Sequence, residues 1–143
     1  MRLRSPLQVL LLSAAALVGA CDKHDLATAT SAPGGSSVSI IGLDPVEEQP
    51  LQPGSKVRVA CRVAYTLTGD KSGQLALIAQ SHSGDLLAST FVPITPATGN
   101  QELSVEFVVP KGTPEIDIFV PLSAGTQGAT TTVSHRAYRV VAK

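Results

Sequence analysis

The stretch that decides the fold is residues 57–67, which read VRVACRVAYTL. Apolar side chains occupy every second position, and Arg, Ala and Thr occupy most of the positions between them. Because successive side chains of an extended strand point to opposite faces, this period of two predicts a strand with one face in a hydrophobic core. The expected inward-facing residues are Val57, Val59, Cys61, Val63, Tyr65 and Leu67.

The same alternation recurs in the second half of the chain. Residues 103–109 read LSVEFVV, and in residues 116–120 branched aliphatic side chains alternate with Asp117 and Phe119. Clusters of Gly, Pro, Ser and Asp separate such runs at regular intervals, which is typical of turns, and no segment has the 3.6-residue period of a helix. These patterns predict seven strands, at about 38–43, 55–68, 74–81, 86–94, 101–109, 115–122 and 130–141.

Seven short alternating strands within residues 38–143 resemble an Ig-like or fibronectin-type-III-like β-sandwich. The resemblance is closest to the Ig-like modules of bacterial envelope proteins. The chain has no tryptophan, and residues 115–122 offer Cys61 no partner, so the disulfide-bearing subtype is excluded. A transthyretin-like sandwich stays open, because the pattern does not determine the strand order. The expected fold class is therefore all-β, a seven-stranded antiparallel Ig-like β-sandwich.

The chain begins with the organisation of an export signal. Residues 1–4 (MRLR) carry two arginines, residues 7–18 are predominantly apolar, and small residues follow. A positive segment, an apolar segment and a small-residue cleavage site, in that order, are typical of a secretory signal peptide. The apolar run of 12 residues is shorter than the roughly 20 residues needed to span a bilayer as a helix.

Cys21 indicates which kind of export signal this is. Val18, Gly19, Ala20 and Cys21 resemble the lipobox of bacterial lipoproteins. The resemblance implies cleavage before Cys21 and diacylation of its thiol. Since each buried methylene contributes about 0.8 kcal/mol, a second acyl chain converts reversible binding into stable anchoring. An ordinary secretory signal, cleaved after Ala20, stays open as the alternative.

These features predict three parts: a signal peptide at 1–20, a lipidated Cys and flexible tether at 21–37, and the sandwich at 38–143. The tether is small and polar, and its 16 residues after Cys21 reach about 20–25 Å as a random coil. The expected location is the bacterial cell envelope, at a membrane facing the periplasm. Asp22 resembles the inner-membrane retention signal of enteric lipoproteins, and the outer membrane stays open.

Charge argues against nucleic acid as a partner. Without residues 1–20 the chain keeps nine Lys and Arg residues against 11 Asp and Glu residues, so it is close to neutral. There is no basic field to neutralise phosphates and no combination of basic and aromatic residues on which bases could stack. The expected partners are the membrane, through the lipid on Cys21, and an envelope protein.

Few residues suggest chemistry. Cys61 alternates with core positions, which favours a small buried side chain over a redox thiol. His24, His82 and His135 do not share the short spacings of metal ligands within one element, so neither a metal site nor a cofactor is expected. Residues 81–85 (SHSGD) contain the residue types of a hydrolase triad. Because these side chains are adjacent on one tight turn, a hairpin is the better interpretation.

A non-catalytic role follows from these observations, with the sandwich mediating protein–protein interaction. Phe119 alternates out of phase with its aliphatic neighbours and is the candidate interaction residue. The alternative is a ligand-binding lipoprotein, whose loops 44–54, 82–85 and 110–114 hold a glycan or Ca²⁺. Asp44, Glu47 and Glu48 supply oxygen ligands there but lack the spacing of a calcium loop, which favours a solvated loop.

Overall fold

The structure is a computed structural model that describes residues 35–70, 72–95, 97–125 and 130–143. The proposed signal peptide, the lipobox, Cys21, Asp22 and His24 lie outside these residues. Over the described part the chain forms seven strands and no helix. They are β1 (Ser37–Asp44), β2 (Lys56–Thr66), β3 (Gly73–Ser81), β4 (Leu86–Ile94), β5 (Thr98–Val108), β6 (Glu115–Ala124) and β7 (Thr132–Arg139).

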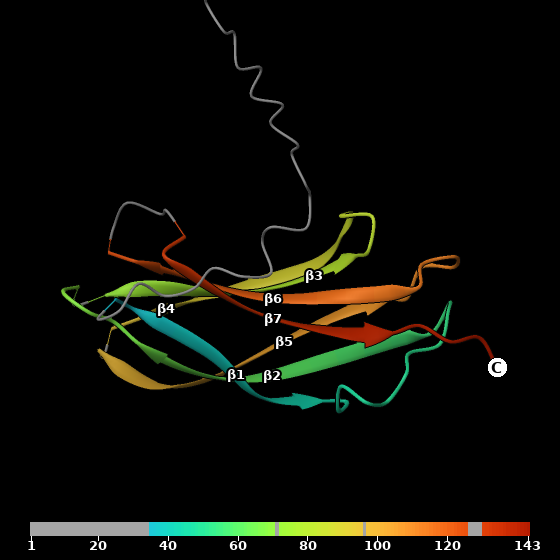
Figure 1. Cartoon of the computed structure of the whole chain (residues 1–143), viewed down its shortest axis with the longest axis horizontal. Helices are drawn as coiled ribbons and strands as arrows, with labels where there is room; N and C mark the ends of the chain where they lie inside the picture. Colours follow the sequence, from blue (N-terminus) through green and yellow to red (C-terminus); the bar gives the residue numbers. More distant parts are fainter. Residues whose placement is uncertain (1–34, 71, 96, 126–129) are drawn as a thin grey trace, which may run out of the picture.

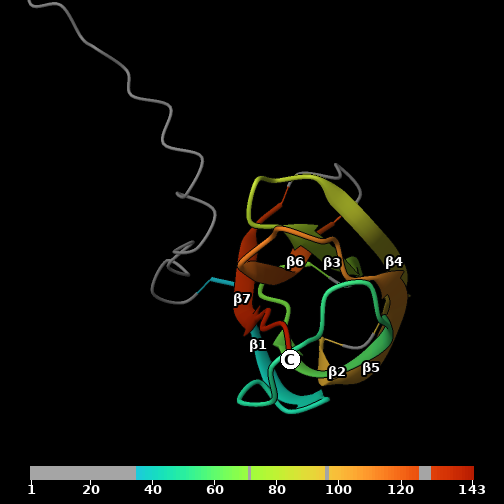
Figure 2. The same ribbon diagram turned by 90° about the vertical axis from the view of Figure 1, so that its right-hand side faces the viewer.

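The strands form two packed antiparallel sheets, with the orders β1-β2-β5 and β4-β3-β6-β7. Figure 1 shows the layers from the side, and Figure 2 shows them end-on. Connections from β2 to β3, from β4 to β5 and from β5 to β6 cross between the sheets. The expected seven-stranded Ig-like sandwich is confirmed. In constant-type Ig domains the fourth strand joins the first sheet, whereas here β4 pairs with β3.

The predicted strands agree with the observed ones, with one notable difference at the start of β5. The Pro and Gly signals at 96–100 predict a turn, but β5 already begins at Thr98 and Gly99 pairs with Tyr65 of β2. A Cβ atom on Gly99 would lie 3.0 Å from the Tyr65 hydroxyl oxygen. The absence of a side chain at Gly99 therefore leaves room for the Tyr65 ring to lie against β5. Glycine within a strand often marks such a close approach.

Alternating apolar residues from both sheets fill the interior. In β2 the buried positions are Val59, Cys61, Val63 and Tyr65, as the alternation predicts, while Val57 is only partly buried. In the other sheet, seven residues of β3 and β6 face the buried residues of β2, and all seven are inaccessible to solvent. They are Leu75, Leu77, Ala79, Ile116, Ile118, Val120 and Leu122. Each fully buried Leu, Ile or Val contributes roughly 1.5–3 kcal/mol relative to its exposed state.

The segment after β1 is attached to the end of β7. Leu51 forms a parallel bridge with Val140, in which its amide donates to the Arg139 carbonyl at 2.8 Å. The buried Tyr138 hydroxyl donates to the Pro45 carbonyl at 2.5 Å. Between β1 and β7, the Ile40 amide donates to Ser134 Oγ at 3.1 Å. These bonds join the two sheets along one side, so the sandwich is held by polar contacts as well as by its core.

Two leucines on neighbouring strands provide a matched test of this core. Leu77 is fully buried in β3, and Leu86 at the start of β4 is 62% exposed. We expect Leu77→Ala to lower the free energy of unfolding by about 2–5 kcal/mol, because it removes buried methyl groups and leaves a cavity. Leu86→Ala should change it by less than about 0.5 kcal/mol. Urea unfolding followed by circular dichroism measures both, and equal costs would contradict the observed orientation of β3.

Candidate functional site

Three loops meet at the end of the sandwich that lies opposite the start of β1. The amide of Gly54 donates to the Val109 carbonyl at 2.8 Å, and the amide of His82 donates to the Glu115 carbonyl at 3.1 Å. The hairpin 82–85 and the loop 110–114 also line one open hollow. Loops 44–54, 82–85 and 110–114 therefore lie at one end, as the ligand-binding alternative requires.

The hairpin between β3 and β4 is closed by its own polar side chains. Ser83 Oγ donates to Asp85 Oδ2 at 2.7 Å, and Ser81 Oγ lies 2.8 Å from Ser83 Oγ and 3.2 Å from the same carboxylate oxygen. Gly84 has a φ of 91°, a conformation that glycine adopts without steric cost. Ser81 is 3% exposed and so is not accessible as a nucleophile. The serines and Asp85 thus act as turn residues, as the sequence indicates.

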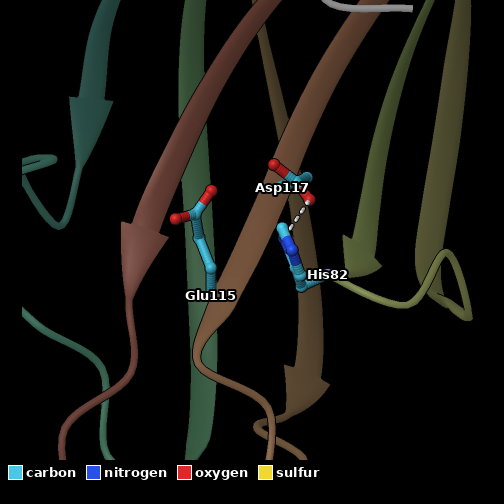
Figure 3. Close-up of side chains that lie close together, drawn as sticks. All are labelled: His82, Glu115 and Asp117. Carbon is cyan, nitrogen blue, oxygen red and sulfur yellow. Dashed lines mark ion pairs between the residues drawn. The ribbon is translucent and has the colours of Figure 1, made fainter. Parts of the chain in front are cut away.

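Asp117 lies between two histidines that are far from it in the sequence. Its Oδ1 is 2.8 Å from His135 Nε2 on β7, and its Oδ2 is 4.0 Å from His82 Nδ1 in the hairpin. The Asp117 side chain is only 16% exposed. Figure 3 shows the His82 ring pointing towards this carboxylate. The mostly buried Asp117 carboxylate is therefore within hydrogen-bond distance of His135, and His82 lies farther away on its other side.

Glu115 completes a group capable of binding a metal ion. It lies two residues before Asp117 on β6, so both carboxylates are on the outer face of the sheet (Figure 3). One ligand atom from each of His82, Glu115 and Asp117 lies within 4.8 Å of the other two. We refer to these three residues as the His82 cluster. The spacing of histidines within single strands does not reveal it, because pairing of β3 with β6 brings the ligands together.

The other acidic residues at this end have a different role. Glu47 Oε2 forms an ion pair with Arg136 Nε at 3.4 Å, which links the segment after β1 to β7. Asp44, Glu47 and Glu48 do not appear in a metal-capable group among the described residues.

Cys61 is a core residue. It is inaccessible to solvent on the inner face of β2 and is a free thiol. Burial raises its pKa to about 11, although the positive charge of Arg136 opposes the shift. Because the thiolate is the reactive form, the Cys61 thiol is held in an inert state.

Phe119 lies on the outer face of the four-stranded sheet, as its phase in β6 indicates. It is half-buried rather than exposed, since its ring stacks on His135 with the ring centroids 4.7 Å apart. Apolar side chains surround it on the neighbouring strands, and Phe91 on the outermost strand β4 is 70% exposed. We call this set the apolar face: Ala76, Ile78, Phe91, Pro93, Phe119, Pro121 and Val133.

The outer face of the three-stranded sheet is different, because charged residues pair across it. Arg58 lies opposite Glu106 and Arg62 opposite Glu102. The Arg58 guanidinium donates to Ser104 Oγ at 3.1 Å. Lys56 donates to Glu106 at 2.9 Å, and this hydrogen bond lowers the pKa of the Glu106 carboxyl. This face therefore carries most of its charges in pairs across β2 and β5, with Val108 as an exposed apolar residue at its end.

Comparisons with known proteins gave matches among solved structures. No protein-family model and no curated protein matches this chain significantly. Among solved structures, it is similar to the CARDB domain of the PF1109 protein from Pyrococcus furiosus, described in complex with di-metal ions, with 14% identity and a TM-score of 0.49. That alignment covers 76% of this chain and 94% of the other. The C-terminal domain of wzt aligns with 12% identity and a TM-score of 0.45, over 77% of this chain and 75% of that one.

In the part of the chain that the structure describes, no helix combines the length and apolar character required to cross a membrane.

The state of Cys61 can be tested with a thiol reagent. In a Cys21→Ser variant Cys61 is the one remaining cysteine. We expect no reaction with a chromogenic disulfide reagent at pH 8 in the native state, because the thiol is buried and its pKa is raised to about 11. One thiol per chain should react in denaturant. Rapid reaction of the native protein would show that β2 does not present Cys61 to the core.

Proposed function

We propose that this protein is a non-catalytic cell-envelope lipoprotein whose sandwich mediates protein–protein interaction through its apolar face. The observation that carries the proposal is the difference between the two outer faces. One carries paired charges beside the exposed Val108, and the other carries the exposed Phe91 and the half-buried Phe119 with their apolar neighbours. Contiguous exposed apolar surface on a small domain is typical of an interaction site.

The strand edges on one side of the sandwich are less suited to binding a partner by strand addition. The register of β1 shifts between Ile40 and Gly42, and such a bulge interrupts pairing with an added strand. Beyond β7, Val140 already pairs with Leu51. These features favour the apolar face over the β1 and β7 edges as the interaction surface.

The proposed anchor is compatible with access to this face. β1 begins at Ser37, at one end of the sandwich, and runs along β2 towards the other end as far as Asp44, which pairs with Ala60. A lipid on Cys21 would hold the domain by that first end, with about 20–25 Å of tether. The outer faces of both sheets would then be accessible beside the membrane surface. The loops 82–85 and 110–114 would lie at the end of the domain that is farther from the membrane.

The anchor has a direct test in the two cysteines. We expect the wild-type protein to sediment with membranes and to incorporate a labelled fatty acid. Cys21→Ser should abolish both properties, because the thiol that carries the lipid is lost. Cys61→Ala is the matched control and should remain labelled and membrane-bound. A Cys21→Ser protein that is still labelled and still sediments with membranes would exclude this anchor.

The interaction surface can be tested with a photoreactive phenylalanine analogue placed at single positions of the full chain in cells. Phe91 on the apolar face and Val108 on the opposite sheet are 70% and 58% exposed, so they form a matched pair. Irradiation should give a discrete protein adduct from position 91 and none from position 108. Adducts of equal yield from both positions, or none from position 91, would count against the apolar face as the interaction surface.

A further inference from the structure

The strongest unassigned feature of the molecule is the His82 cluster, which plays no part in the proposed interaction. We propose that His82, Glu115 and Asp117 form a binding site for one divalent transition-metal ion such as Zn²⁺, with His135 supporting Asp117 through a hydrogen bond. The site lies at one end of the four-stranded sheet, and its ligands come from the β3–β4 hairpin and from β6.

The distances in the cluster are compatible with coordination after small side-chain movements. Metal–ligand bonds of about 2.0–2.2 Å in a tetrahedral site place neighbouring ligand atoms about 3.4 Å apart. His82 Nδ1 and Asp117 Oδ2 are 4.0 Å apart, and the ligand atoms of all three residues lie within 4.8 Å of one another. An ion between them requires each pair to close by about 1.5 Å or less, which rotation about side-chain bonds provides.

The backbone under the cluster is already held in place. Ser81 pairs with Ile116 in the β3–β6 ladder, and the His82 amide donates to the Glu115 carbonyl at 3.1 Å. The Ser81–Asp85 hydrogen bonds close the hairpin directly beside His82. The ligand backbones therefore need not move when an ion binds, and only side-chain freedom is lost.

The ligand set indicates the class of ion. Imidazole nitrogen suits Zn²⁺ and other transition metals, whereas Ca²⁺ and Mg²⁺ prefer oxygen ligands alone. Two carboxylates and a neutral histidine balance the charge of a divalent cation. Three protein ligands leave one tetrahedral position for water or for a group from another molecule.

His135 gives Asp117 the second partner that metal-binding carboxylates usually have. Its Nε2 lies 2.8 Å from Asp117 Oδ1, the oxygen turned away from His82. The His135 ring is itself fixed by stacking on Phe119. Such hydrogen bonds orient a ligating carboxylate, and their removal typically weakens metal binding about 10- to 100-fold. The arrangement therefore contains both the ligands and the outer partner of a metal site.

The test is calorimetric titration of the full chain, purified in detergent without a polyhistidine tag and stripped with EDTA. We expect one Zn²⁺ or Co²⁺ per chain and much weaker binding of Ca²⁺ and Mg²⁺. His82→Gln and Asp117→Asn should abolish binding, and His135→Asn should weaken it about 10- to 100-fold. His24→Gln and Glu102→Gln, a histidine and an acid outside the cluster, are the matched controls and should bind as the wild type does.

A second measurement guards against variants that fail to fold. In the wild-type protein, Co²⁺ should broaden the imidazole resonances of His82 and His135 before those of His24, because the paramagnetic ion would lie beside them. Absence of stoichiometric binding, binding that survives in a folded Asp117→Asn protein, or broadening of His24 first would overturn the proposal. Neither measurement needs a partner protein, so failure of the metal site and failure of the proposed interaction can be told apart.

Discussion

The antiparallel pairing of β3 with β6 is the constraint on which the rest of the structure depends. Leu75 lies opposite Leu122 and Ala79 opposite Ile118, and all four side chains are buried, so this pair of strands supplies one side of the core. Because side chains alternate, the same register turns Asp117 and Phe119 outwards. It also brings His82, just beyond the end of β3, next to Glu115. A slip of one residue in β6 would bury the carboxylate and expose Ile118.

The two outer faces of the sandwich carry different kinds of residues. On the three-stranded sheet, opposite charges face each other across β2 and β5 and keep that surface hydrated. On the four-stranded sheet, β6 changes along its length from acidic at Glu115 and Asp117 to apolar at Phe119 and Pro121. His135 is at the boundary, where it bonds Asp117 and stacks on Phe119. The proposed metal site and the proposed interaction surface are therefore neighbours.

Prediction from the sequence succeeded where the signal was local and periodic. The alternation in residues 57–67 identified β2 and its buried face, including Cys61, and turn signals located most strand ends. The prediction was wrong at residues 98–100, which form the start of β5 instead of a turn. Pairing with β2 and packing of the Tyr65 ring against Gly99 outweighed the turn-forming tendency of the glycine. It also treated His82 and His135 as isolated side chains. Their common neighbour Asp117 is 35 residues from one and 18 from the other.

The sequence by itself determined the all-β class, the buried and outer faces of most of β2, β5 and β6 and the outward position of Phe119, because all of these depend on a period of two along one segment. The tertiary structure alone decided the strand order, the difference in polarity between the two outer faces and the convergence of His82, Glu115 and Asp117. These properties depend on which strands pair and in which register, and that choice is made by burial of the whole core rather than by any one segment.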